Sequence, residues 1–419
     1  MKILHVNTFS KGGAAKACIR LHQSLVQKNI ASKIIFLKKN SEEVIEESIE
    51  FIDNYLPQKN IFQRAIRKCF RLTISNNIKQ QIKKKVSNGE IEWFSFPDSD
   101  YDLTTHPYYQ EADIIHLHWV ADFIDFSFFK KNKKPIVWTL HDMNSFTGGC
   151  HYSDNCTLFK SDCNVCHQLG GLDKKTYSEI SFNLKSKALK GVKNIQIVSP
   201  STWLMNFSLS SKLFGNMPHY CIPYGIDCQI FKIKDKIKAR EKLNFPIDKK
   251  IILFVADSIK NKRKGFLYLE KAVEKLFFET DFLLVIVGGN SSEKATLKNR
   301  ISLGKVNDEQ LMAAIYVAAD VLVIPSTEDN LPNTALESLM CGTPIIAFPI
   351  GGMVDIIEHK VNGLLAKNIS VEALEESLCD FFDEINKWNS EEIRANAIKK
   401  YSSEIQANAY IELYKKIIN

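Results

Sequence analysis

The stretch that decides the fold is Val321–Met353, with the sequence VLVIPSTEDNLPNTALESLMCGTPIIAFPIGGM. Two short apolar runs in it, Val321–Pro325 and Thr343–Phe348, are rich in β-branched residues and typical of buried parallel strands. Between them, Pro332 suits the first turn of a helix, where its missing amide hydrogen would be unpaired anyway, and Gly342 suits the left-handed residue that ends one. The stretch therefore predicts a strand, an acidic loop, a helix and a second strand, as in an open α/β sheet.

Two carboxylates stand where such a sheet binds ligands. Ligands bind outside the carboxyl ends of the strands, and the free amides at a helix start favour an anion such as phosphate. Asp329 lies in the acidic loop and Glu337 follows about two helical turns later, so both side chains can face one crevice. Carboxylates beside a phosphate make sense as acceptors of hydrogen bonds from the hydroxyl groups of a ribose and a sugar. The alternative is that Asp329 caps the helix and Glu337 lies on the solvated surface.

The run EDNLPNTALESLMCGTPIIAFPIGG, residues 328–352, resembles the nucleotide-sugar signature of glycosyltransferase family 4, whose members are retaining enzymes with the GT-B fold. The resemblance implies that Glu337 binds the nucleotide ribose and that Asp329 meets the donor sugar as a catalytic residue. It also implies a donor site around the amides of the helix start, with the residues Asn330, Leu331, Asn333 and Thr334. The first acid of the family is usually Glu, and Glu328 stands next to Asp329 and competes for that role.

Length and composition predict two domains. A chain of 419 residues exceeds what one hydrophobic core supports, and its 45% of hydrophobic residues is typical of a globular protein. With the resemblance, we expect two Rossmann-like α/β domains with a deep cleft between them, the GT-B architecture. Residues 1–200 would bind the acceptor and residues 201–395 the nucleotide sugar, while residues 396–419 would form a helix that returns to the first domain. Residues from about 40 to 110 are predicted to be a peripheral basic insertion.

Two loops of the first domain carry further candidates. Gly12 and Gly13 precede a predicted helix, but GGAA lacks the full spacing of a nucleotide-binding fingerprint, so a simple turn is equally compatible with it. The resemblance implies that this loop contacts the donor sugar and phosphate. His141 follows a predicted strand, and His116 and His118 end the neighbouring one. A lone histidine is more often packed than catalytic, but the resemblance implies that His141 faces the donor sugar as a catalytic residue.

A basic loop follows the first predicted strand of the second domain. Arg263 and Lys264 lie in this loop, SIKNKRKGF, beside the predicted phosphate crevice. Such cations neutralise a diphosphate, and an arginine can do so with two parallel hydrogen bonds. Lys264 matches the lysine before glycine of the family, whereas the family's arginine is absent from its usual position and Arg263 is its candidate replacement. A solvated turn is the alternative interpretation.

Residues 148–168 form a loop rich in cysteine. Its sequence is GGCHYSDNCTLFKSDCNVCHQ, in which four cysteines fall within seventeen residues: Cys150, Cys156, Cys163 and Cys166. Clustered thiols of this kind predict a structural zinc site that orders a loop poor in apolar residues. Two disulfides or four free thiols are the alternatives, because the spacing is not one of the common zinc patterns.

Charge and hydropathy bear on the partners and the location. The net charge of +7 is modest for this length, so nucleic acid is not expected as a partner. Residues 59–85 carry nine lysines and arginines, no acid and interleaved apolar residues, which resembles a basic amphipathic helix on an anionic membrane surface. A solvated or internal helix is the alternative. Because no apolar run reaches the ~18 residues of a spanning helix and MKILHVNTF resembles a buried strand, we expect a cytoplasmic protein, peripheral on the inner membrane face.

The resemblance to family 4, which covers nearly the whole chain in order, implies a retaining glycosyltransferase. It would move a sugar from a UDP- or GDP-sugar to a hydroxyl group of a glycan, lipid-linked acceptor, in the synthesis of bacterial lipopolysaccharide or capsule. No nucleophile paired with a base stands out, which agrees with a mechanism in which the leaving diphosphate deprotonates the acceptor, and no catalytic metal is expected. A nucleotide-sugar epimerase of the same fold and a non-catalytic sugar-nucleotide-binding relative are the alternatives.

Overall fold

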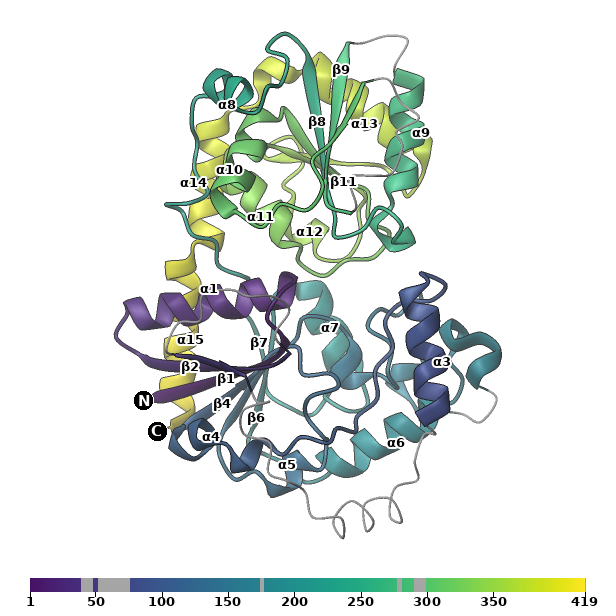
Figure 1. Ribbon diagram of the computed structural model, residues 1–419, viewed down its shortest axis with the longest axis vertical. Coiled ribbons are helices and arrows are strands. Elements are labelled where there is room, and N and C mark those ends of the chain that lie inside the picture. The colour runs from purple at the N-terminus through teal and green to yellow at the C-terminus, as the bar shows by residue number, and fades with distance from the viewer. Residues whose placement is uncertain (39–47, 52–75, 174–176, 277–280, 290–298, 419) are drawn as a thin grey trace. The chain divides into compact units, whose positions relative to one another are not determined.

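The computed structural model describes residues 1–38, 48–51, 76–173, 177–276, 281–289 and 299–418, which divide into two compact units. The first unit is Met1–Ile222 with the chain end from Ala409 onward, and the second unit is Pro223–Asn408. Each unit contains one parallel sheet with helices on both of its faces (Figure 1). The two parallel-sheet α/β domains predicted from the sequence are confirmed.

The first unit is built on a seven-stranded sheet in the order β3-β2-β1-β4-β5-β6-β7, and each neighbouring pair is parallel. The strands are β1 Lys2–Phe9, β2 Ala31–Lys38, β3 Ile49–Phe51, β4 Ile114–Leu117, β5 Ile136–Thr139, β6 Ile195–Ser199 and β7 His219–Cys221. Side chains alternate between the two faces of a strand, so Leu4 and Val6 enter the larger apolar cluster while His5 lies on the opposite face.

Helices cover both faces of this first sheet. The larger apolar cluster takes residues from α4 Pro107–Glu111, α5 Phe128–Lys131, α6 Tyr177–Leu189 and α7 Thr202–Ser210. On the other face, α1 Gly13–Gln27 packs Ala15 and Cys18 against Ile34 and Phe36 of β2. The end of α15 Ser403–Ile418 also belongs to this unit.

The second unit is built on a six-stranded sheet in the order β10-β9-β8-β11-β12-β13, also with parallel pairs. The strands are β8 Lys250–Val255, β9 Phe282–Val287, β10 Arg300–Ser302, β11 Val321–Ile324, β12 Ile345–Ala347 and β13 Gly363–Leu365. The predicted strand, loop, helix and strand of residues 321–353 are therefore β11, α11 Asn333–Met340 and β12.

The helices of the second unit also form two layers. In Figure 1, α9 Phe266–Leu276 and α13 Val371–Asp383 lie on one side of the sheet, and both supply residues to one apolar cluster. α10 Glu309–Ala318 and α11 lie on the other side. The remaining helices of this unit are α8 Lys236–Lys242, α12 Met353–Ile356, α14 Ser390–Tyr401 and the start of α15.

The observed division of the chain lies beyond the predicted boundary between residues 200 and 201. β7 pairs with β6 and so completes the first sheet before the chain leaves that unit after Ile222. The chain returns at Ala409, not at residue 396, because α14 contacts α11, and Ser402 pairs with Ile226, within the second unit.

The predicted basic insertion, residues 40–110, is not wholly peripheral. β3 lies within it and adds an edge strand to the first sheet by pairing with β2. α3 Asn76–Ser87 buries Ile82 in a small cluster with Phe94, Phe96, Cys166, Leu169 and Tyr177.

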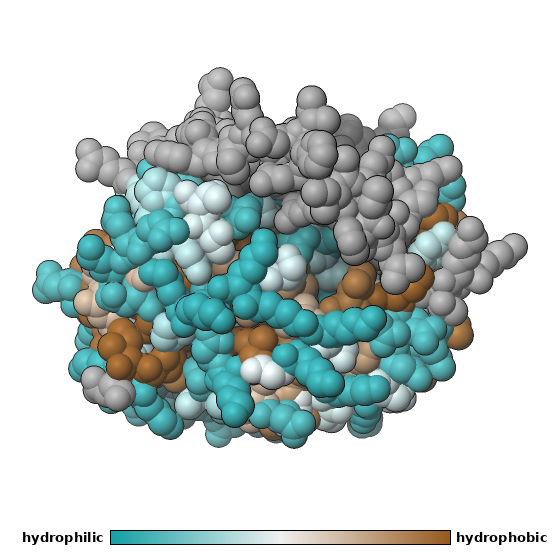
Figure 2. Space-filling view, turned by 90° about the horizontal axis from the view of Figure 1, so that it is seen from below, coloured by the Kyte–Doolittle hydropathy of each residue, from teal (hydrophilic) through white to brown (hydrophobic). Residues whose placement is uncertain are grey.

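Only part of the predicted membrane-surface helix, residues 59–85, lies among the described residues. Of its lysines, Lys79 pairs with Asp98, Lys83 lies 3.9 Å from Asp122, and Lys85 lies 3.1 Å from Glu90. Among the coloured residues of the face drawn in Figure 2, hydrophilic ones predominate and hydrophobic ones form separate patches. Among the described helices, none has the length and apolar content needed to cross a bilayer. Binding to a membrane surface stays a prediction.

Candidate functional site

The carboxyl edge of the second sheet presents the start of α11. β11 ends at Ile324, and the acidic loop leads to Pro332, which occupies the position before the first helical residue and makes no side-chain cap. The first turn of α11 contains no acid. Because the first amides of a helix have no partner within it, this end favours an anion.

A lysine and an arginine meet Asp329 at this edge. The Nζ atom of Lys264 lies 2.7 Å from Oδ2 of Asp329, and Nη1 of Arg263 lies 3.8 Å from Oδ1. Arg263 also donates to the backbone oxygen of Glu328 at 2.7 Å. Burial acts to raise the pKa of Asp329, but the two cations and the hydrogen bonds from Lys264 and Asn330 outweigh it, so the pKa lies below its usual value. Asp329 is therefore an ionised, buried carboxylate.

Two glycines allow the neighbouring loops to approach the backbone of residues 325–329 closely. Gly265 has φ 71°, and a Cβ there would lie 1.7 Å from the backbone oxygen of Pro325, so only glycine lets the basic loop contact the end of β11. Gly351 has φ 52°, and its Cβ would lie 1.7 Å from the backbone oxygen of Asp329. Gly351 was not among the predicted site residues, although a Gly-Gly pair shortly after a strand is a signal for a close backbone approach.

Glu328 and Asp329 occupy different environments. The Asp329 residue is 5% exposed and its carboxylate faces Lys264, whereas Glu328 is half-buried and its backbone oxygen accepts from Arg263. Of the two neighbouring acids, Asp329 is the one whose carboxylate pairs with the predicted phosphate-binding lysine.

Glu337 is buried on α11, with 3% of its surface exposed. Its Oε2 accepts a hydrogen bond from the hydroxyl of Tyr316 at 2.9 Å, which fixes the carboxylate in one orientation. The sequence analysis missed Tyr316, because it lies on α10, 21 residues earlier in the chain, and no local pattern links it to Glu337.

The other predicted donor residues surround these groups. Asn330 and Leu331 are buried in the loop, and Asn333 and Thr334 are half-buried at the start of α11. The second unit thus brings together eight of the predicted site residues: Arg263, Lys264, Asp329, Asn330, Leu331, Asn333, Thr334 and Glu337.

Gly12, Gly13 and His141 belong to the first unit, at the carboxyl edge of its sheet. Gly12 precedes α1 with φ 98°, and both glycines are exposed. His141 follows β5, and its Nε2 lies 3.2 Å from Nδ1 of His118.

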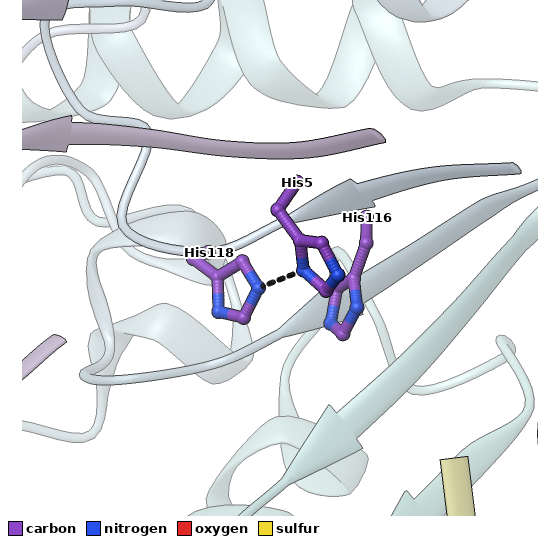
Figure 3. A group of neighbouring side chains, drawn as sticks. All are labelled: His5, His116 and His118. Carbon is purple, nitrogen blue, oxygen red and sulfur yellow. Dashed lines mark hydrogen bonds between the residues drawn. The ribbon is translucent and has the colours of Figure 1, made fainter. Parts of the chain in front are cut away.

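His141 is one end of a chain of buried histidines. Nε2 of His118 shares a hydrogen bond of 2.9 Å with Nδ1 of His5, as Figure 3 shows. His116 pairs with His5 across β1 and β4, and its two ring nitrogens lie 2.6 Å from the Tyr414 hydroxyl and 2.7 Å from Thr139 Oγ1. These side chains share the face of the sheet that α1 and the end of α15 cover.

The four histidine rings are neutral. His5, His118 and His141 form a hydrogen-bonded chain, and His116 bonds to Tyr414 and Thr139 beside it. Burial lowers the pKa of His5, His116 and His118 well below the usual value, and it lowers the pKa of His141 to about 4. Nitrogen atoms of His5, His116 and His118 lie within 4.8 Å of one another, as three metal ligands would. However, the rings of His116 and His118 are stacked with an interplanar angle of 23°, so their in-plane lone pairs are nearly parallel and do not converge on one ion.

The four predicted zinc ligands differ in burial. Cys163 and Cys166 are buried, Cys150 and Cys156 are half-buried, and Cys163 Sγ accepts from the Gly148 amide at 3.2 Å. Zinc analysis of the purified protein would distinguish the predicted zinc site from its alternatives, two disulfides or four free thiols, because it counts bound metal directly. The structural zinc stays a prediction.

Comparison with known proteins identifies the second unit. Residues 249–384 match the family described as glycosyl transferases group 1. The second unit carries a group 1 glycosyltransferase domain. The family recognised in residues 328–352 is confirmed, since both acids and both cations of the candidate site lie inside the matched segment.

Curated relatives extend this similarity. A glycosyltransferase of Methanocaldococcus jannaschii, itself uncharacterized, is 28% identical over 262 residues, which are 60% of this chain and 61% of that protein. The chain thus matches about three fifths of that relative's length. WcaC of Escherichia coli K12, named for colanic acid biosynthesis, is 22% identical over 436 residues and the match covers 100% of both chains.

Solved structures share the fold of the whole chain. Sucrose-phosphate synthase of Thermosynechococcus elongatus superimposes with a TM-score of 0.69 at 17% identity, covering 100% of this chain and 99% of that one. HepE of Anabaena, solved with UDP and glucose, has a TM-score of 0.67 at 14% identity and 99% coverage of both chains. The predicted GT-B fold is confirmed.

Proposed function

We propose that this chain is a retaining glycosyltransferase that moves a sugar from a nucleotide-sugar donor to a hydroxyl group of a glycan acceptor. One observation carries the proposal: a buried, ionised carboxylate, two cations and an uncapped helix start meet at the carboxyl edge of the group 1 domain. A nucleoside diphosphate sugar has matching chemistry, with an anionic diphosphate between a ribose and a sugar that both carry hydroxyl groups.

The donor groups would divide between these residues. The α11 amides, Arg263 and Lys264 would hold the diphosphate, and Glu337 would accept hydrogen bonds from the ribose. Tyr316 holds the Glu337 carboxylate in place at 2.9 Å, so that it is oriented before the nucleotide arrives. Asp329 would accept from a hydroxyl group of the donor sugar. By the family resemblance, Gly12, Gly13 and His141 would also contact that sugar.

The transfer itself needs little from the protein beyond position and charge. The acceptor oxygen bonds to C1 of the sugar on the face that the diphosphate leaves, and the bond between C1 and the phosphate oxygen breaks. The departing diphosphate takes the proton of the acceptor hydroxyl, so the products are a glycoside of unchanged configuration and a nucleoside diphosphate. Lys264, Arg263 and the helix amides would stabilise the negative charge that develops on the diphosphate, by roughly 3–4 kcal/mol for each well-placed donor.

The substrates are inferred from similar proteins. WcaC, which matches the whole chain, is named for colanic acid biosynthesis, and HepE was solved with UDP. We therefore propose a UDP-sugar, with a GDP-sugar as the second choice, and a lipid-linked glycan acceptor in cell-surface polysaccharide synthesis.

A turnover assay tests this function. Purified protein would be incubated with UDP- and GDP-sugars, with and without a lipid-linked acceptor extract, while the free nucleoside diphosphate is measured. Release that depends on the acceptor, and a product of retained anomeric configuration, are expected. Turnover to an isomerised sugar without acceptor would instead indicate an epimerase, and binding without turnover across the panel would indicate a non-catalytic relative.

A further inference from the structure

An exposed tryptophan stands out at the carboxyl edge of the first sheet. Trp93 is 47% exposed, although large aromatic side chains are normally covered. Its ring centroid lies 6.1 Å from that of Phe9, at the end of β1, and 6.0 Å from that of Trp119, just after β4. Both contacts are edge-to-face, with interplanar angles of 72° and 87°, so the indole is held in position while much of it stays accessible.

The ring beneath Trp93 is itself firmly held. Trp119 stacks on His151 at 5.1 Å, and its Nε1 donates to Oδ2 of Asp142 at 2.6 Å. His151 Nδ1 lies 2.6 Å from the same oxygen, and the amide of His151 donates to the backbone oxygen of Trp93 at 3.3 Å. We call Phe9, Trp93 and Trp119 the aromatic platform. It is rigid because its members are fixed by stacking and hydrogen bonds before any ligand arrives.

A small pocket adjoins the aromatic platform. Its wall is mainly apolar and includes Trp119, and His141, Asp142, Asn144 and Ser145 supply polar groups. Its cavity volume of about 20 Å³ has room for one water-sized group, such as a hydroxyl. Burial acts to raise the pKa of Asp142, but the neighbouring His151 and hydrogen bonds lower it overall, so the carboxylate is ionised. The pocket would therefore repel an anion and accept hydrogen bonds from hydroxyl groups.

We propose that the aromatic platform is a subsite for one pyranose ring of the acceptor glycan. A pyranose has one face of C–H groups and a rim of hydroxyl groups. The C–H face would lie on the exposed indole of Trp93, whose π-surface is negative and attracts polarised C–H groups, while the hydroxyl rim would reach Asp142 and Ser145 in the pocket. An alkyl chain would gain no hydrogen bond from these polar groups, and a diphosphate would meet the Asp142 carboxylate, so a neutral sugar fits this chemistry best.

Identifying this ring as part of the acceptor rests on the proposed function, but its binding can be measured without turnover. The probes are methyl α-D-glucopyranoside, methyl β-D-galactopyranoside, methyl α-D-mannopyranoside and methyl N-acetyl-β-D-glucosaminide, with sorbitol as a polyol that lacks a ring. Saturation-transfer NMR would report binding of each probe and the C–H groups that contact the protein. We expect at least one glycoside to bind through the C–H groups of one ring face, and sorbitol not to bind.

Matched variants separate stacking from a general loss of apolar surface. Trp93→Ala is expected to weaken glycoside binding about tenfold and Trp93→Phe only a few-fold, because phenylalanine keeps a smaller π-surface. Leu209→Ala is the control, since Leu209 is also in the first unit and is 43% exposed. Thermal unfolding would verify that each variant is folded. If no glycoside binds, or if Trp93→Ala binds as well as wild type, the proposal is wrong.

Transfer kinetics distinguish this proposal from the proposed function. With active enzyme, Trp93→Ala should raise KM for the acceptor about tenfold while KM for the donor stays within twofold. An unchanged acceptor KM, with transfer intact, would overturn the platform alone. Glycoside binding that depends on Trp93, in a protein that never transfers sugar, would overturn the proposed function alone. A rise in the donor KM instead would show that the stacked ring belongs to the donor.

Discussion

The two units bury ionisable side chains in opposite ways. We call the Asp329 site of the second unit the charged edge, and the buried histidines of the first unit the neutral edge. In the second unit, Asp329 stays charged because Lys264 and Arg263 lie beside it. In the first unit, His5, His116 and His118 stay buried because they lose their charge. His5 bonds to His118, and His116 bonds to Thr139 and Tyr414. A carboxylate with cations beside it suits an anionic donor, whereas the buried neutral rings contribute to the stability of the first unit.

The largest expected effect comes from removing a cation at the charged edge. Lys264→Ala should lower turnover about 10²- to 10³-fold, because it removes one stabiliser of the leaving diphosphate and leaves Asp329 with one cation fewer. Lys262→Ala, an exposed lysine of the same turn, should leave turnover unchanged. Steady-state rates of the two variants decide this, and an equal loss in both would mean that the loop contributes only general positive charge.

At the neutral edge, the comparison predicts a loss of stability instead. Tyr414→Phe removes the hydroxyl that lies 2.6 Å from Nδ1 of His116 and leaves a buried ring nitrogen unpaired, which should lower the free energy of unfolding by about 1–3 kcal/mol. Tyr410→Phe should cost less, because Thr139 keeps its bond to His116. Urea unfolding at pH 7.5 measures both, and equal, negligible losses would show that these bonds do not stabilise the chain.

Because of the buried histidines, the free energy of unfolding should also fall as the pH is lowered. The folded histidines have lowered pKa values, so below about pH 6.5 the unfolded chain binds protons that the folded chain does not. The free energy of unfolding is then full above pH 6.5 and falls by about 1.4 kcal/mol per pH unit for each such histidine below it.

A matched pair of histidine variants tests this slope. His116→Gln should reduce the slope of the free energy of unfolding against pH by the contribution of one histidine. His167→Gln should leave this slope unchanged, because the side chain of His167 is 49% exposed. Urea unfolding between pH 5 and 7.5 gives the slopes, and the same slope for wild type and His116→Gln would contradict a neutral buried His116.

The smallest expected effect is that of salt on ligand binding. Salt should weaken binding of the donor but not binding of a glycoside. Raising the NaCl concentration from 0.05 to 0.5 M should raise the donor KM by roughly two- to fivefold, since it screens the attraction of Arg263 and Lys264 for a diphosphate. Glycoside binding on the aromatic platform should not change, because it involves no charged ligand. Equal salt dependence for both ligands would contradict the proposal that one site binds an anion and the other a neutral sugar.

Local patterns made the charged edge predictable. β11, α11 and β12 follow from the apolar runs, Pro332 and Gly342 in one stretch, and the motif within it led to Asp329, Glu337 and, through the family, Lys264. Tyr316 could not be foreseen, because its contact with Glu337 depends on how α10 packs beside α11.

The neutral edge was much less predictable. The sequence placed His116, His118 and His141 at neighbouring strand ends, but Tyr414 lies 298 residues from its partner His116 and reaches it only because the chain end returns to the first unit. The edge strand β3 and the ring contacts of Trp93 likewise depend on tertiary packing, which no short pattern encodes.

The central claim is that the charged edge of the second unit binds the donor nucleotide. Isothermal titration of UDP and GDP into wild type, Glu337→Gln and Lys262→Ala tests it most directly. We expect one of the two nucleotides to bind at one site per chain, about tenfold or more weakly in Glu337→Gln and unchanged in Lys262→Ala. Binding that is equal in all three proteins, or no binding of either nucleotide to wild type, would contradict the account.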